Sequence, residues 1–142
     1  KYSCFVNIVE EMELNLYPES QRSVLFDLLS YANKIELNRL VLTTHSPYVI
    51  NYLTLAAKAF LLTQKVSANE TLQERIKEVV PADSAIDPAR LRIYELKDGG
   101  VFRLSTYEGL PSDENFLNIQ LGVTNELFDQ LLEIEQEFDY KN

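Results

Sequence analysis

Two short apolar runs, each followed by a helical stretch, constrain the fold of this chain more than any other feature. Residues 5–9 and residues 40–44 are apolar and rich in β-branched side chains, and the first run predicts a buried strand. Apolar residues recur with helical spacing over residues 18–35, and again from Pro47 to about Lys65. Alternation of strand and helix favours parallel strands joined by a right-handed crossover. The first half of the chain therefore predicts an α/β fold.

The second half predicts a helix over about 71–80 and then an antiparallel hairpin. Residues 91–96 and 101–107 flank a turn with Asp-Gly at its centre, and this dipeptide tolerates the positive φ angles of tight hairpins. Residues 109–122 resemble a loop that can include a helical turn, and a last helix is expected over about 125–139. That helix is expected to bury its apolar side chains, which are Leu127, Phe128, Leu131, Leu132, Ile134 and Phe138.

Acidic residues and the single histidine follow the two predicted strands. Glu10 and Glu11 end the first strand, and His45 ends the second in T-T-H-S-P, where Ser46 can cap the next helix and Pro47 can open it. Open α/β sheets bind ligands beyond the carboxyl ends of parallel strands. A carboxylate there can hold Mg²⁺, a second can activate water, and a histidine can contact a phosphate. A solvated acidic loop and a histidine that serves only as a turn residue are the structural alternatives.

The glycine pattern excludes several nucleotide and hydrolase motifs. The chain has four glycines, Gly99, Gly100, Gly109 and Gly122, and none is followed by lysine. The phosphate-cradling loop G-x-x-x-x-G-K-[ST] is therefore absent, as are G-x-G-x-x-G and G-x-S-x-G. With Cys4 as the single cysteine, neither an internal disulfide nor a Cys/His-rich zinc site is possible. No run is long and apolar enough for a membrane span, so we expect a soluble protein of the cytoplasm.

Two motifs occur in order, separated by one predicted helix: V-E-E-M-E-L-N-L-Y-P from residue 9 and L-V-L-T-T-H-S-P-Y-V-I from residue 40. The first resembles the Walker B segment and D-loop of ABC-type ATPases, most closely those of the SMC/RecF/OLD-like AAA branch. The second is similar to their switch-histidine segment. The downstream hairpin, E-G-L-P and acidic helix also look like the C-terminal end of those proteins.

The resemblance implies a role for each matching residue. Glu10 matches the Walker B acid that supports Mg²⁺ through water in the family pattern, and Glu11 matches the glutamate that activates the attacking water. Asn15 and Leu16 match the D-loop, which contacts the partner subunit across the nucleotide. His45 matches the switch histidine. The implied cofactors are ATP and Mg²⁺, and the implied assembly is an ATP-dependent homodimer.

The sequence differs from the family pattern at one position and lacks two of the family's motifs. Met12 stands where the family usually has proline, and this is expected to loosen the turn. The Walker A loop and the signature motif precede Walker B in the family, and neither is present. We therefore expect one domain over 1–142, a C-terminal piece of a larger ATPase, with a Walker B and switch-histidine unit over 1–66 and the helix, hairpin and acidic helix over 67–142. The piece alone is expected to be inactive and to need the lobe that carries Walker A.

Two other functions remain open from the sequence. One is a non-hydrolysing relative in which the same fold serves as an interaction or dimerisation module. The other is a metal-dependent nuclease that uses Glu10, Glu11 and Glu13, which is disfavoured because the chain contains no D-x-D motif.

Negative charge is concentrated at the C-terminal end. The net charge is −9, of which residues 1–107 carry −1 and residues 108–142 carry −8. The acidic residues of the last predicted helix are Glu126, Asp129, Glu133, Glu135, Glu137 and Asp139. They form either a solvated face or a docking face for a basic partner. Such a surface repels phosphate backbones, so this part of the protein is not expected to bind nucleic acid.

Overall fold

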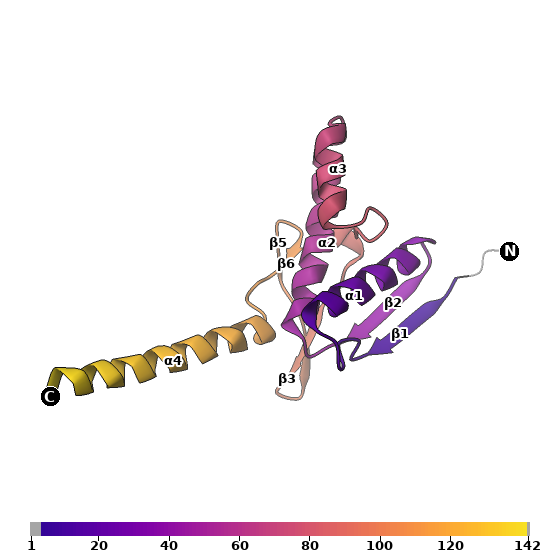
Figure 1. The fold of residues 1–142 in the computed structure, drawn as a ribbon. Helices are drawn as coiled ribbons and strands as arrows, with labels where there is room; N and C mark the ends of the chain where they lie inside the picture. The colour runs from indigo at the N-terminus through magenta and orange to yellow at the C-terminus, as the bar shows by residue number, and fades with distance from the viewer. Residues whose placement is uncertain (1–3, 142) are drawn as a thin grey trace.

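A computed structural model describes residues 4–141, apart from the side chains of Glu137, Asp139 and Lys141 (Figure 1). The acidic side chains predicted at Glu137 and Asp139 thus lie outside the described part. The elements in chain order are β1 (Val6–Glu10), α1 (Pro18–Asn33), β2 (Arg39–Thr43), α2 (Pro47–Lys65), α3 (Glu70–Val79), the 3-10 turn η1 (Pro88–Arg90), β3 (Tyr94–Lys97), β4 (Gly100–Arg103), β5 (Thr106–Tyr107), β6 (Leu110–Pro111) and α4 (Phe116–Lys141).

The first half of the chain is a parallel strand pair with helices. β1 and β2 pair in parallel, from Val6 opposite Arg39 to Glu10 opposite Thr43, and α1 lies between them in the chain. The carboxyl ends of both strands therefore meet at one edge of the sheet. This confirms the predicted α/β character, and a short parallel sheet with flanking helices is compatible with part of a P-loop fold.

The core lies between α1, α2 and one face of this sheet. Leu25 and Val49 are completely buried at its centre, one from each helix. The sheet contributes partly buried apolar side chains at alternating positions, Val9, Leu40 and Leu42. Alternation follows from the pleat, which points successive side chains to opposite faces.

The opposite face of the sheet is open. Val6, Ile8 and Val41 point away from the helices and are 64%, 66% and 47% exposed. The prediction of a buried strand is therefore correct for one face and wrong for the other. Within residues 4–141 no element packs on that face, so its apolar residues remain in contact with solvent.

Two consecutive hairpins follow η1. Asp98 (φ 51°) and Gly99 (φ 73°) form the turn between β3 and β4, as predicted. Glu108 (φ 49°) and Gly109 (φ 79°) form a second such turn between β5 and β6. The sequence analysis missed this second hairpin, because glutamate rarely adopts the left-handed conformation that the turn requires. The predicted single strand over 101–107 is divided between β4 and β5, and the segment 109–122, expected as a loop with a helical turn, contains β6 and the start of α4.

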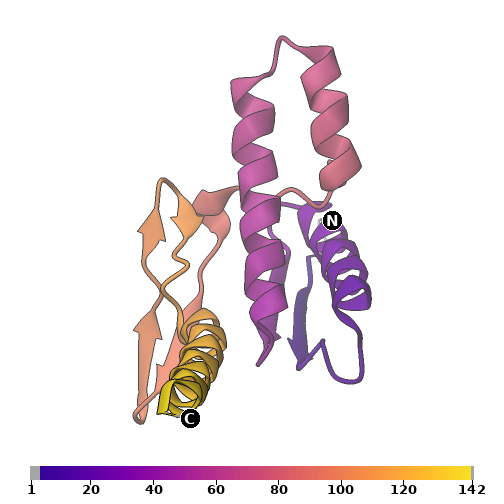
Figure 2. The same ribbon diagram turned by 60° about the vertical axis from the view of Figure 1, so that its left-hand side comes forward.

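The last helix is longer and less buried than predicted. α4 begins at Phe116 rather than near 125, and Asn115 accepts the backbone N–H of Asn118 at 3.0 Å through its side chain. From there α4 extends away from the body (Figure 1; seen almost end-on in Figure 2). All six apolar side chains that were expected to be buried are exposed. Neither α4 nor any other helix of residues 4–141 is long and apolar enough to cross a membrane.

Candidate functional site

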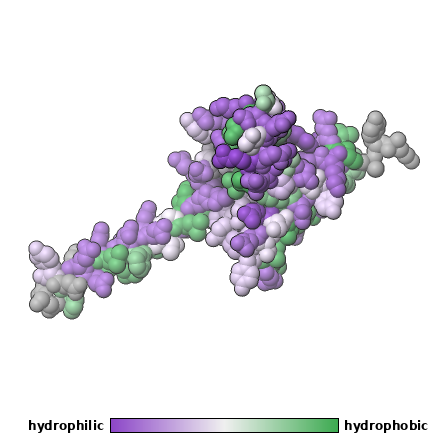
Figure 3. Space-filling view, turned by 45° about the horizontal axis from the view of Figure 1, so that its top comes forward, coloured by the Kyte–Doolittle hydropathy of each residue, from purple (hydrophilic) through white to green (hydrophobic). Residues whose placement is uncertain are grey.

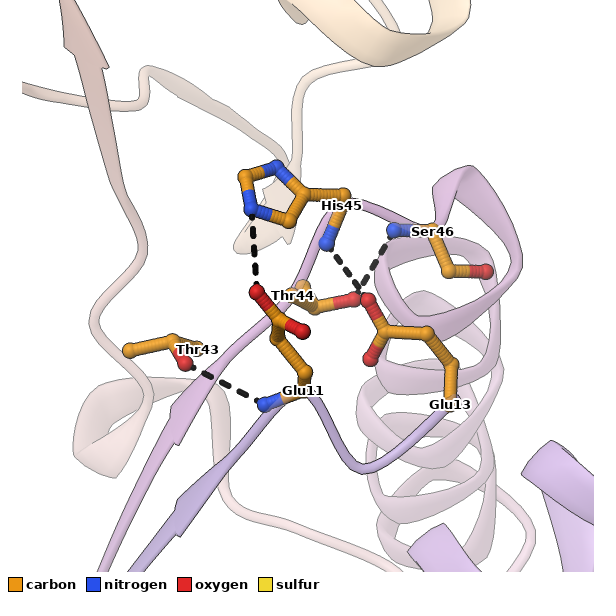
Figure 4. A network of polar contacts seen from close by, with 6 residues as sticks. All are labelled: Glu11, Glu13, Thr43, Thr44, His45 and Ser46. Carbon is orange, nitrogen blue, oxygen red and sulfur yellow. Dashed lines mark hydrogen bonds and ion pairs between the residues drawn. The ribbon is translucent and has the colours of Figure 1, made fainter. Parts of the chain in front are cut away.

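The carboxyl ends of β1 and β2 bring Glu11 and His45 together. The Nε2 atom of His45 lies 3.6 Å from Oε1 of Glu11 (Figure 4). The His45 side chain is 84% exposed and that of Glu11 49% exposed, so both are open to a ligand. The two residues that the sequence analysis placed at neighbouring strand ends therefore form one site, and their contact is an ion pair when the imidazole is protonated.

The backbone at Glu11 adopts a left-handed conformation, with φ at 47°. For a residue with a side chain this conformation costs about 1–2 kcal/mol. The Glu11 N–H donates to the carbonyl oxygen of Thr43 at 3.0 Å and approaches its Oγ1 at 3.3 Å. These contacts with β2 hold the turn, and the turn directs the Glu11 carboxylate toward His45 (Figure 4).

Glu13 is a second link between the loops that follow β1 and β2. Its Oε1 atom accepts the backbone N–H of His45 at 2.6 Å (Figure 4). Its Oε2 atom is buried and has no hydrogen-bond partner within the described residues. The sequence analysis considered Glu13 only as a nuclease ligand and missed this contact, which joins residues 32 positions apart.

The T-T-H-S-P segment is held by side-chain contacts that differ from those predicted. Ser46 stands at the N-cap position of α2, but its hydroxyl makes no capping bond. The hydroxyl instead donates to Oε1 of Gln21 at 2.6 Å, and both side chains are buried. The backbone N–H of Ser46 donates to Oγ1 of Thr44 at 2.9 Å (Figure 4). The expected capping bond is therefore absent, and the Ser46 hydroxyl is directed toward Gln21 of α1 instead.

The remaining predicted site residues lie near this edge without joining the Glu11–His45 contact. Glu10 ends β1 on the same face as Val6 and Ile8, which is the open face of the sheet. Asn15 is exposed and adopts a left-handed conformation, with φ at 59°. The carbonyl oxygen of Leu16 accepts the side-chain N–H of Gln21 at 2.9 Å.

The side chain of Met12, which stands in the loop after β1, packs into the core. It is 7% exposed and belongs to the core cluster with Leu25 and Val49. The backbone around it is closed by hydrogen bonds from Leu14 to Glu11 and from Leu16 to Glu13, each at 2.9 Å. Burial of an apolar side chain thus anchors the loop where proline would have restricted its backbone.

The site is acidic. Glu10, Glu11 and Glu13 lie within four consecutive positions of the chain, so a phosphate group approaching this edge needs an intervening cation. Within the described residues, no group of three or more His, Cys, Asp and Glu side chains is arranged to hold a metal ion. Mg²⁺ commonly takes one or two protein carboxylates and completes its shell with water and phosphate oxygens. The donors present fit that mode of binding rather than a cage made only of protein.

Comparison with known families matches the first third of the chain to a family of ATPase-type domains. Residues 6–51, about a third of the chain, match the family described as "AAA domain, putative AbiEii toxin, Type IV TA system". The match spans β1, α1, β2 and the start of α2, and so includes the Glu11–His45 site. It supports an ATPase-type domain of the AAA, P-loop kind. Neither the curated proteins nor the solved structures contain a match to this chain.

Proposed function

We propose that this chain supplies the hydrolytic side of the ATP site in an ABC-like AAA ATPase. Glu11 activates the attacking water, Glu10 supports Mg²⁺ through water, and His45 contacts the γ-phosphate. The observation that carries the proposal is the 3.6 Å contact between Glu11 and His45 at the carboxyl edge of a parallel sheet.

The chemistry of Glu11 follows from its position. A general base must reach the proton that it removes, either directly or through one water. The Glu11 carboxylate is half exposed, and its backbone is tied to β2 by the N–H contact with Thr43. It thus combines access to water with a defined position. His45 stands beside it, where a neutral or charged imidazole can donate a hydrogen bond to a phosphate oxygen.

Glu10 fits the role of supporting a metal ion. It ends β1 on the open face of the sheet, so its carboxylate is accessible from the side that no described element covers. When Mg²⁺ is bound, it neutralises charge on the nucleotide phosphates. The carboxylate of Glu10 then orients water in the metal shell, which is the usual arrangement for a cation that keeps several waters.

Phosphate binding must come from another part of the protein. Backbone N–H groups of a glycine-rich loop and a lysine usually cradle the phosphates, and this sequence has no such loop. We propose that an N-terminal lobe of the same protein supplies them and covers the open face at Val6, Ile8 and Val41. Asn15 and Leu16 then face a second subunit in an ATP-dependent homodimer.

Replacement of Glu11 by Gln in the full-length protein tests the proposal. The amide keeps the size of the side chain but cannot act as a base, so turnover should fall by about 10²–10⁴-fold while ATP binding is retained. Glu36→Gln, an exposed change just before β2, serves as the matched control and should leave turnover unchanged. Unchanged turnover in Glu11→Gln would refute the assigned role. Absence of turnover in the unmodified protein would instead favour an interaction module.

A second experiment tests the need for the other lobe. We expect calorimetry of this 142-residue chain with millimolar ATP to show no saturable binding. A saturating isotherm would contradict the view that the phosphate-binding groups lie elsewhere.

A further inference from the structure

α4 carries an exposed apolar stripe. The stripe consists of Leu127, Phe128, Leu131, Leu132, Ile134 and Phe138, all exposed. At 3.6 residues per turn these positions occupy about 160° of the helix circumference. Figure 3 shows apolar side chains along the helix where it extends from the body. The stripe is therefore an exposed, mainly apolar surface on one side of a projecting helix.

The body holds only the beginning of α4. The backbone N–H of Phe116 donates to Oε1 of Glu95 at 2.5 Å, and the Asn118 side chain donates to that of Asn51 at 3.3 Å. Beyond these residues α4 runs away from the other described elements (Figures 1 and 2). A helix of this length spans about 39 Å. Most helices in proteins owe their stability to packing of an apolar face. We therefore expect another protein segment, the occupant, to pack on this surface.

One carboxylate lies inside the stripe. Glu135 is four residues after Leu131 and three before Phe138, so it is on the same side of the helix as both. Its side chain is exposed. An occupant that covers the stripe must either place a cation against Glu135 or remove its carboxylate from water without a partner, which is strongly unfavourable.

The charges of α4 disfavour a second copy as that occupant. The helix has six acidic residues and one basic residue, Lys141. Two copies packed through the stripe would bury the Glu135 carboxylate of each against apolar or acidic groups of the other. The acidic residues on the rest of the surface, Glu126, Asp129 and Glu133, would face a helix with six acidic residues and a single lysine.

We propose that the apolar stripe of α4 binds an amphipathic helix of a partner protein, whose apolar face carries Lys or Arg opposite Glu135 and whose flanks are basic. Apolar burial along the stripe supplies affinity. The pairing at Glu135 fixes the register, as single polar positions do in coiled coils. This surface is separate from the proposed ATP site and does not depend on it.

Two synthetic peptides of about four heptads probe the surface. Both carry leucine at the heptad core positions. The basic peptide has lysine at the flanking positions and at one core position, and the acidic peptide has glutamate at the same places. Fluorescence anisotropy with the full-length protein, without nucleotide, should show binding of the basic peptide that weakens as salt rises, and no binding of the acidic one. Equal binding of both peptides, or of neither, would overturn the proposal.

Three variants locate the binding surface. Leu131→Ser should weaken binding of the basic peptide by more than about tenfold, and Gln136→Ser, a matched change outside the stripe, should not. Glu135→Gln should weaken it by about fivefold. Because Glu135 is exposed, this variant keeps α4 intact and tests the proposal even where Leu131→Ser unfolds the helix. Unchanged binding in Glu135→Gln, or self-association that Leu131→Ser abolishes and Gln136→Ser does not, would overturn it.

Discussion

The Oε1 atom of Glu13 accepts the backbone N–H of His45 at 2.6 Å. This contact fixes the histidine loop to the acidic loop through the main chain of His45, while the imidazole of the same residue contacts Glu11 at 3.6 Å. One carboxylate thus positions the backbone and another meets the side chain. The exposed imidazole keeps its freedom to contact a ligand, because its backbone rather than its ring is held.

Removal of the Glu13 carboxylate should therefore destabilise the loops. Glu13→Ala loses the bond to the His45 N–H and is expected to lower the free energy of unfolding by about 1 kcal/mol. Glu13→Gln keeps an acceptor oxygen and replaces a partly buried charge by a neutral group, so its stability should stay close to that of the parent. Urea denaturation measures both. Equal losses in Ala and Gln would mean that the hydrogen bond to His45 contributes little.

Loss of the buried hydrogen bond between Ser46 and Gln21 should lower the free energy of unfolding more than loss of the Glu13 contact. Ser46→Ala removes the donor at 2.6 Å and leaves Oε1 of Gln21 buried without its partner, at a cost of about 1–3 kcal/mol. Ser23→Ala is the matched control, since its hydroxyl is exposed and bonds only to the carbonyl of Glu19 within the same helix. We expect the control to change stability little. Similar effects of the two substitutions in thermal denaturation would argue against a buried pair.

The core between α1 and α2 should respond to loss of volume. Leu25 is completely buried, and Leu25→Ala is expected to lower the free energy of unfolding by about 2–5 kcal/mol through lost burial and a cavity. Val24, the preceding residue of α1, is 36% exposed, so Val24→Ala should have a much smaller effect. Equal effects in urea denaturation would contradict the observed orientation of α1.

The turn between β5 and β6 offers a stabilising substitution. Glu108 has φ at 49°, a conformation that asparagine adopts more readily than glutamate. Glu108→Asn should raise the free energy of unfolding by about 0.5 kcal/mol and raise Tm accordingly. Glu114→Asn is the control, because Glu114 is exposed and is not among the residues with positive φ. A gain at both positions would point to reduced negative charge rather than to turn geometry.

Sequence patterns predicted those parts of the fold whose cause is local. Helical spacing and Pro18 and Pro47 gave α1 and α2 nearly their observed bounds, and Asp98-Gly99 marked the first hairpin turn. The second hairpin was missed because glutamate rarely adopts the left-handed conformation that Glu108 has in its turn. α4 was placed too late and judged buried, because periodicity shows which side of a helix is apolar and not whether anything covers it.

For the site, the sequence determined which residues follow the two strands and hence which side chains share one edge of the sheet. Parallel pairing then follows from the alternation of strand and helix, and it brings Glu11 and His45 together. Tertiary structure alone decided that Glu13 binds the His45 backbone, that Ser46 bonds to Gln21 instead of capping α2, and that Met12 anchors its loop in the core. These contacts join atoms from different elements, so their formation depends on distances that no local pattern of residues specifies.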